Sequence, residues 1–287
     1  MAVALVAVST SGPLIAATTA PAMAIAFWRN GLATLVIAPY AFLRRAPRAE
    51  ILSLSRREVR LALLAGLVLA LHFATWVPSL RYTSVASSTA LVATQPVWAA
   101  LIARAFGHRV PRRAWFGIGV ALAGVVVLTG VDVAVSGRAL VGDVLALLGA
   151  VFAAAYVFTG AAVRATVSTT TYTLLCYGSA AVLLLGVCLV GGVALSGYSS
   201  EDWARIVALV LGAQLLGHSL FNVVLRTTSP VVVSLAILFE MPGATLIAAL
   251  TLGQVPPPAI LPAAALLLVG VGLVVTSQRD LPAIPAE

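Results

Sequence analysis

The chain has 287 residues, of which 61% are hydrophobic and only 9% are charged. A soluble domain carries about a quarter charged residues, so this composition excludes an ordinary soluble protein and indicates membrane-spanning helices. The net charge of +8 does not indicate a nucleic-acid partner, because the basic residues are all arginines gathered mainly in short connections between apolar segments.

Ten apolar segments follow one another, each close to the roughly 20 residues that a helix needs to cross a bilayer. Their apolar residues run continuously instead of alternating with polar ones, which favours helices over a β-barrel. No connection is long enough for a soluble domain. The predicted spans are 2–18, 22–43, 59–80, 84–104, 114–130, 141–163, 170–195, 203–225, 231–252 and 259–276.

The start of the chain resembles a secretory leader, because Met1 opens into apolar sequence and Ala22-Met23-Ala24 imitates a cleavage site. A leader needs a positive charge before its apolar core, and the first basic residue is Arg29. We therefore expect residues 2–18 to be retained as a span. A short cytoplasmic tail ahead of Met1 is an open alternative.

Arginine is distributed unevenly over the connections. If the chain crosses ten times, thirteen arginines lie on the side of both termini, whereas only Arg81, Arg138 and Arg205 lie on the other. Positive charge is retained on the cytoplasmic side, so both termini and the tail 277–287 are predicted to be cytoplasmic, in the inner (plasma) membrane. The basic connections can also contact anionic membrane lipids.

The second half of the chain repeats the first at an offset of 146 residues. Five spans in each repeat would give the two copies opposite orientations, the arrangement of many secondary transporters. The sequence thus predicts an all-α membrane protein of two inverted five-helix repeats, 1–130 and 141–276. The matched pairs include Ser88 with Ser234, Pro96 with Pro242, Gly107 with Gly253, Pro111 with Pro257 and Gly124 with Gly270.

Several motifs are similar to those of EamA-type transporters in the drug/metabolite transporter superfamily. They are residues 80–84 leading to Gln95-Pro96-Val97-Trp98, Phe239-Glu240-Met241-Pro242 leading to Leu252-Gly253, Phe27-Trp28-Arg29-Asn30, and Gly142-Asp143 leading through Tyr156 to Arg164. The resemblance covers almost the whole chain and implies a ten-helix carrier. The family often has an acidic residue where this chain has His108 and Gln254, so no role is transferred to those helix ends.

The function expected from the repeat and this resemblance is export of a small metabolite, amino acid or drug-like compound by alternating access. Proton antiport is the expected driving force, and uptake, exchange or facilitated diffusion are open alternatives. The alternative is an intramembrane enzyme or a lipid-handling protein. No catalytic residues, metal or cofactor are predicted, because the sequence has no paired-histidine metal motif, no phosphate-binding glycine loop and no pair of intramembrane aspartates.

Two charged residues lie inside predicted spans. Glu240 falls near the middle of its span, where a carboxylate costs on the order of 3 kcal/mol unless it is protonated, paired or hydrated. It is the first candidate for proton coupling, and a structural carboxylate tied to Arg29 or to hydroxyl groups is the alternative. Arg29 either reaches toward the membrane surface or faces the cavity and holds an anionic group of the substrate.

Other polar side chains inside the spans are weaker candidates for a substrate or proton pathway. His72 and His218 are matched by the repeat and titrate near neutral pH, but a lone intramembrane histidine is more often part of the hydrogen-bonded structure. Trp76 can stack on a substrate or pack in the core. The further candidates to line a cavity are Gln95, Tyr156, Gln214 and Asn222.

Pro13, Pro96 and Pro242 fall inside predicted spans and interrupt the helical hydrogen bonds. They either only shape the bundle or act as hinges beside a cavity. Stripes of small residues, Gly117-Ala121-Gly124 and Gly142-Ala146-Ala150-Ala154, indicate close helix contacts. These contacts lie within the chain or form a homodimer face.

Overall fold

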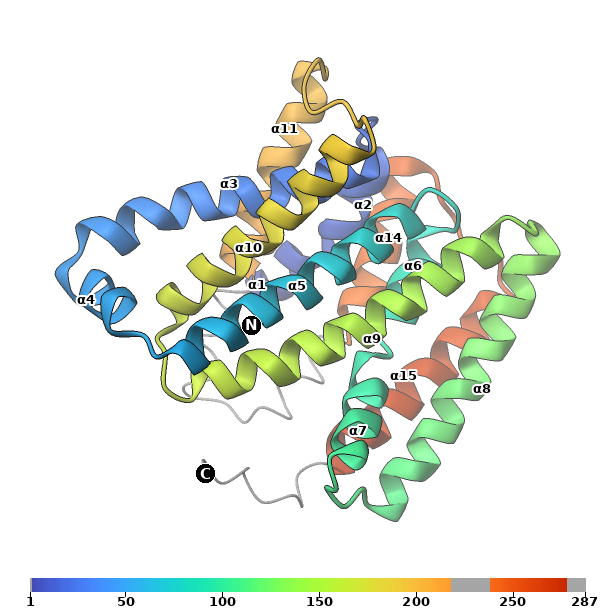
Figure 1. Cartoon of the computed structure of the whole chain (residues 1–287). Helices are drawn as coiled ribbons and strands as arrows, with labels where there is room; N and C mark the ends of the chain where they lie inside the picture. Colours follow the sequence, from blue (N-terminus) through green and yellow to red (C-terminus); the bar gives the residue numbers. More distant parts are fainter. Residues whose placement is uncertain (1, 218–237, 278–287) are drawn as a thin grey trace.

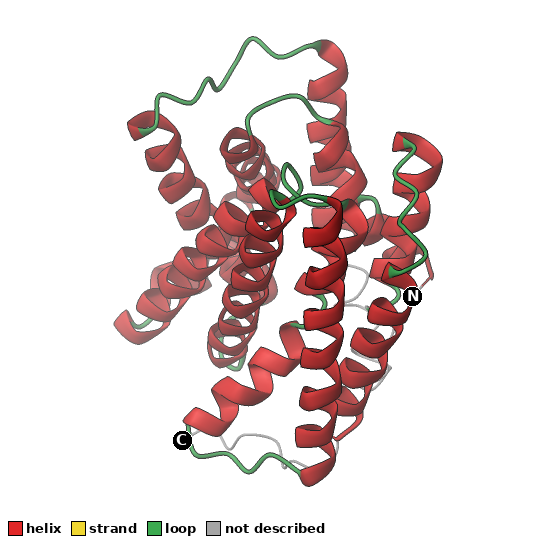
Figure 2. Ribbon diagram, turned by 90° about the vertical axis from the view of Figure 1, so that its right-hand side faces the viewer, coloured by secondary structure: helices red, strands yellow, loops and turns green. Residues whose placement is uncertain are grey.

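The computed structural model describes residues 2–217 and 238–277, and every regular element in these residues is a helix (Figures 1 and 2). Seven helices are long and apolar enough to cross a membrane. They are α3 (Ala22–Leu43), α5 (Arg56–Ser79), the joined pair α6–α7 (Val85–Ala105), α8 (Arg112–Val135), α9 (Ala139–Arg164), α10 (Thr169–Val190) and α15 (Ile260–Ser277).

Shorter helices account for the remaining predicted spans. The first span is divided into α1 (Ala2–Ser9) and α2 (Ser11–Ala17), and α14 (Glu240–Leu252) forms the last part of the ninth. The eighth span begins as α11 (Ser200–Ala208) and continues as the wider π-helix η1 (Leu209–Gly217). Residues 218–225 and 231–237 of the expected spans lie outside the described residues, and a short surface helix, α4 (Arg45–Ser53), joins α3 to α5.

Each of the three prolines expected as hinges lies in the first turn of a helix, whereas Pro39 and Pro78 lie inside α3 and α5. Pro13 is the third residue of α2, directly after the break at Thr10, and Pro96 is the second residue of α7, after the break at Ala93 and Thr94. Pro242 is the third residue of α14. A first turn has no intrahelical partner for its amide groups, so a proline there costs little. The three prolines therefore coincide with helix starts, while their role as hinges stays a prediction.

The helices pack in pairs drawn from the two halves of the chain. Figure 1 shows α5 beside α9, α8 beside α15 and α10 across α3, and each of these pairs is in contact. Two further contacts join α1 to η1 and α6 to α14.

Glycines allow α8 and α15 to approach each other with their backbones almost in contact. A Cβ atom on Gly117 would lie 2.7 Å from the carbonyl oxygen of Gly270, and one on Gly270 would lie 2.4 Å from the amide nitrogen of Ala121. Gly124 faces Leu267 in the same way. The predicted stripe of small residues on 117–124 is thus an internal helix contact, which is the usual use of such stripes in membranes.

The connections between helices gather at two opposite ends of the bundle. At one end, named here the Arg81 end, Arg81 donates to the carbonyl oxygens of Thr18 and Ala20, and the Gln254 side chain accepts from the amide of Val85. At the other, named the Glu50 end, Glu50 in α4 accepts from the hydroxyls of Ser168 and Thr171 at the start of α10.

Hydrogen bonds set the charge of Glu50. Although partial burial opposes it, these bonds from Ser168 and Thr171 lower the pKa of the Glu50 carboxyl below its usual value. The carboxylate therefore caps the first turn of α10 and fastens the surface helix α4 to it.

Substitution of Gly117 by alanine tests the close contact between α8 and α15. The added methyl group must displace the α15 backbone, so Gly117→Ala is expected to lower the free energy of unfolding in detergent by about 1–3 kcal/mol. Gly119→Ala is the matched control on the same helix, since a Cβ there meets nothing within 4 Å. The control should be neutral or slightly stabilising. Equal stability of the two variants would contradict the packing.

Candidate functional site

The interior of the bundle holds an arginine. The side chain of Arg29 in α3 is only 3% exposed, so it faces the protein interior and does not reach the membrane surface. Its Nε donates to Oε1 of Gln214 in η1 at 2.5 Å, and its Nη1 donates to Oγ of Ser11 in α2 at 3.0 Å. The consecutive helices α2 and α3 and the distant η1 therefore converge on one guanidinium.

Aromatic rings of α5 cover the remaining side of the guanidinium. The Cζ atom of Arg29 lies 4.5 Å from the ring centroid of Phe73 and 5.8 Å from that of Trp76. The negative face of an aromatic ring attracts a cation at such distances, most strongly where water is excluded. Arg29, Ser11, Phe73, Trp76 and Gln214 form what we call the Arg29 chamber.

The charge of Arg29 has no carboxylate partner within 4 Å among the described residues. The ion pairs found there join Arg205 to Glu201 and to Asp202. Glu240, the half-buried first residue of α14, lies farther from Arg29 than an ion pair but close enough to interact with it electrostatically. The two side chains thus lie near each other without forming an ion pair.

The other predicted pathway residues divide into those near the chamber and those apart from it. His72 stacks on Trp76 with ring centroids 5.6 Å apart, and its Nδ1 lies 2.9 Å from the carbonyl oxygen of Gly149 in α9. This bond fits the structural interpretation of His72. Trp76 is buried in the core, and its Nε1 has no hydrogen-bond partner. His218 lies outside the described residues.

Tyr156 and Gln95 occupy other parts of the bundle. Tyr156 in α9 is half-buried and lies beside Tyr172 and Tyr177 of α10, and Tyr177 in turn interacts electrostatically with Arg29. Gln95 begins α7, which packs mainly against α9 and α15. The described contacts do not bring Gln95 to the Arg29 chamber.

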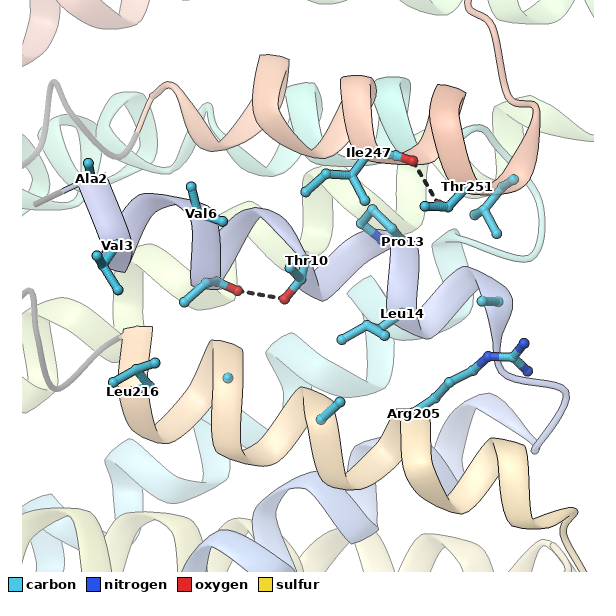
Figure 3. Close-up of a pocket in the computed structure, with 15 residues that line it drawn as sticks. Ala2, Val3, Val6, Thr10, Pro13, Leu14, Arg205, Leu216, Ile247 and Thr251 are labelled. Carbon is cyan, nitrogen blue, oxygen red and sulfur yellow. Dashed lines mark hydrogen bonds between the residues drawn. The ribbon is translucent and has the colours of Figure 1, made fainter.

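A groove of about 820 Å³ lies on the other side of α2 and η1 (Figure 3). Apolar side chains such as Val6, Leu14, Leu216 and Ile247 line it, and Arg205 stands at one end. Its hydroxyl groups are already used, because Thr10 donates to Ala7 and Thr251 donates to Ile247. The groove suits an apolar occupant, whereas the chamber suits a charged one.

A hydrogen-bonded network closes the Arg81 end. Asp202, before the predicted eighth span, accepts from the amide of Thr19 at 2.9 Å and from its hydroxyl at 2.5 Å. Arg81 holds the neighbouring residues Thr18 and Ala20 through their carbonyl oxygens, at 2.5 and 2.9 Å. We call this network the Arg81–Asp202 latch, since it joins the α2–α3 connection to the α5–α6 connection and to α11.

The charges of the latch follow from these contacts. Hydrogen bonds from Thr19 lower the pKa of the Asp202 carboxyl below its ordinary value. Partial burial lowers the pKa of Arg81, and the Asp202 carboxylate opposes that shift. Both groups are therefore charged at neutral pH.

Three features of this region are absent from the sequence-based prediction: Ser11, Phe73 and the latch. Helical spacing offers a signal for Phe73, because residues 73 and 76 share a face of α5. The latch has a weaker signal, in that Glu201 and Asp202 begin a helix, where acidic residues cap amide groups. The partner of Asp202 comes from a connection 183 residues away, and no local pattern indicates it.

Membrane-length helices packed around a buried arginine define a multi-pass membrane protein. A model of the EamA-like transporter family matches residues 1–130 and 140–276. The chain therefore belongs to the EamA-like transporter family, with two domains that span most of it. Members of this family are transporters and not enzymes, so membership implies transport of a small molecule across a membrane.

Solved structures share the fold. Fourteen chains match, among them a protein described only as "Crystal structure of protein", with a TM-score of 0.66 and 19% sequence identity over 97% of this chain and 96% of that one. At this identity the likeness shows the fold alone. Comparison with curated proteins gave no match.

Removal of the Gln214 side chain tests how the buried charge is held. Gln214→Leu leaves Nε of Arg29 without its acceptor, so the free energy of unfolding should fall by about 2 kcal/mol. Arg29→Met together with Gln214→Leu removes both partners and should be less destabilising than the sum of the single changes. Strict additivity in this double-mutant cycle would show that the two side chains do not interact.

Proposed function

We propose that the protein is a secondary transporter that exports a small zwitterionic metabolite, such as an amino acid, by alternating access with proton antiport. The observation that carries this proposal is the placement of Arg29 and Glu240, two ionisable side chains that lie too far apart for an ion pair but close enough to interact electrostatically. A carboxylate of the substrate would bind Arg29, whose guanidinium offers a fixed set of donors. An amino group would bind Glu240.

Competition at Glu240 would couple transport to the proton gradient. In this mechanism the Glu240 carboxylate binds either the ammonium group of the substrate or a proton, but not both. Export of substrate then leaves a carboxylate that takes up a proton from outside and returns it to the cytoplasm. A single charge crossing about 100 mV releases roughly 2.3 kcal/mol, which is enough for a concentration gradient of about fiftyfold.

Two features support the inverted repeat that such a mechanism uses. Under a five-span repeat, the contacts α3–α10, α8–α15 and α6–α14 each join equivalent helices, and α5–α9 is equivalent to η1–α1. A pseudo-twofold axis would produce these pairings. In addition, the connections that contact one another at the Arg81 end are ones that ten crossings would place together on one membrane face. Those that contact one another at the Glu50 end would lie together on the opposite face.

The Arg81–Asp202 latch supports alternating access. It ties the predicted first, second, third, fourth and eighth spans together at one end, and we interpret the described conformation as closed there. The arginine distribution assigns this end to the outside, with both termini in the cytoplasm. Opening of the latch would then expose the chamber to the outer solution, with the breaks before Pro13 and Pro96 as the hinges.

Substitution of Glu240 tests the coupling. In proteoliposomes loaded with a mixture of radiolabelled amino acids, a pH gradient should drive efflux by the wild type, and Glu240→Gln should reduce this efflux by roughly tenfold or more. The amide cannot exchange a proton, so any remaining transport should not depend on pH. Glu201→Gln, an exposed carboxylate, is the control. Transport by Glu240→Gln with the wild-type pH dependence would exclude Glu240 as the coupling site.

Substitution of Asp202 tests the latch. Because the folded-state pKa of Asp202 is lowered, its stabilising effect is complete above the ordinary carboxyl value of about 4 and disappears as the pH falls through the lowered value. Asp202→Asn should imitate acid at neutral pH and favour the open state. The distance between spin labels at Gly137 and Ser196, in a cysteine-free background, should then be longer in Asp202→Asn than in the wild type. In Glu201→Gln this distance should not change. Unchanged distances in Asp202→Asn would contradict the latch.

A further inference from the structure

Two buried aspartates meet at the Arg81 end, apart from the Arg29 chamber. Asp132 lies near the end of α8 and Asp143 near the start of α9, and their side chains are 6% and 0% exposed. The carboxyl groups lie within hydrogen-bonding reach of each other. The sequence predicts no pair of aspartates in the membrane, but α8 extends beyond the predicted end at residue 130 and the tight α8–α9 connection brings the two together.

The Asp143 carboxyl has no ordinary hydrogen-bond donor. Among the described residues, neither of its oxygens has a partner at hydrogen-bonding geometry, although the hydroxyls of Thr83 and Thr129 lie close by. The Thr129 hydroxyl is itself buried without a partner. Asp132 accepts only a long bond of 3.4 Å from Thr83, and Ser87 lies beside it. Buried carboxyl oxygens are almost always hydrogen-bonded, and a proton held by one carboxyl would supply a donor to the other.

No basic side chain among the described residues neutralises the pair. Arg81 binds the carbonyl oxygens of Thr18 and Ala20, and Arg138 lies 4.9 Å from the ring centroid of Tyr82. The third arginine at this end, Arg205, pairs with Glu201 and Asp202.

The helices packed against the pair supply no further charge. Neither α6 nor α15 carries an ionisable side chain. On α5, His72 binds the carbonyl oxygen of Gly149. The other ionisable side chains of α5 lie in its first two turns, at the opposite end of the helix: Arg56, Arg57, Glu58 and Arg60. On α7 the ionisable side chain is Arg104, in its last turn and exposed.

Backbone packing fixes the place of the pair. A Cβ atom on Gly142 would lie 2.7 Å from the amide nitrogen of Thr83, so only glycine lets the start of α9 press against the α5–α6 connection. This contact seats the Thr83 hydroxyl beside both carboxyl groups.

Two ionised carboxylates in contact in a water-free site repel each other strongly, and one of them takes up a proton. A sodium ion would have to separate the two groups to insert itself between their oxygens, whereas a proton holds them in contact. We propose that Asp132 and Asp143 form a proton-binding site, in which one carboxyl donates a hydrogen bond to the other. The charge of the pair changes from −2 to −1, and the nearby hydroxyls donate to the remaining negative oxygens.

The bound proton fastens the α8–α9 connection to α6 and to the α5–α6 connection. When the Arg81 end rearranges and water reaches the pair, the proton passes to water and the two carboxylates separate. The site is distinct from Glu240, because it lies on other helices, and it does not depend on the identity of the transported substrate.

The test is infrared spectroscopy of the purified protein in lipid nanodiscs, titrated from about pH 5 to pH 9. Glu240→Gln serves as the background, so that no signal from that carboxyl interferes. The C=O stretching band of a protonated, buried carboxyl should persist at neutral pH and disappear when Asp132→Asn or Asp143→Asn is added. Absence of this band at neutral pH in the Glu240→Gln background would overturn the proposal, whatever the fate of the double variants.

Thermal unfolding gives a second measurement. The folded pair binds a proton that the unfolded chain releases. The unfolding midpoint should therefore fall by roughly 3 °C per pH unit as the pH rises from the ordinary carboxyl value of about 4 to the pKa of the folded pair. Asp143→Asn should flatten this dependence, because the amide group donates a hydrogen bond to Asp132 without taking up a proton from solution. Glu201→Gln should leave the dependence unchanged. Equal slopes in all three proteins would overturn the proposal. Loss of the C=O stretching band on addition of sodium, but not of choline, would also overturn the proposal, since the site would then bind a metal cation.

Discussion

The burial of Arg29 without a paired carboxylate is the constraint on which this structure depends. An arginine at the centre of a bilayer costs on the order of 3 kcal/mol, even by the lower estimates. The protein offsets this cost with the amide oxygen of Gln214, the hydroxyl of Ser11 and the faces of Phe73 and Trp76. These groups belong to η1, α2 and α5, so the folded positions of three helices are tied to a single cation on a fourth.

This constraint gives a reason for the irregular helices around the chamber. The break at Thr10 allows α2 to turn relative to α1, and Ser11 directly follows it. Gln214 lies in the π-helix η1, a wider form that recurs at functional sites. In contrast, α8 and α15 are uninterrupted and meet through Gly117 and Gly270. The molecule thus combines a rigid, closely packed pair with a group of interrupted helices that surround the charge.

The helices could be predicted from sequence far better than their contacts. The range 22–43 predicted for the second span coincides with α3, because a long apolar run with few charges is stable in a membrane as a helix that satisfies its own backbone hydrogen bonds. The partners of Arg29 could not be predicted, since Gln214 is 185 residues away in the sequence. In addition, an arginine about 12 Å from the start of its helix can equally extend its side chain to the membrane surface. Similarly, Asp132 lay beyond the predicted end of its span, which concealed its contact with Asp143.

Opposite orientation of the two repeats is the central claim, because it is what would enclose one charged chamber between them. The most direct test compares Arg109 and Val255, two exposed positions at the same place in each repeat. Each is replaced by cysteine in a background without Cys176 and Cys188, and intact cells are treated with a maleimide that cannot cross the membrane. Cysteine at 255 should react from outside and cysteine at 109 only after lysis. Reaction of both from the same side would contradict the account.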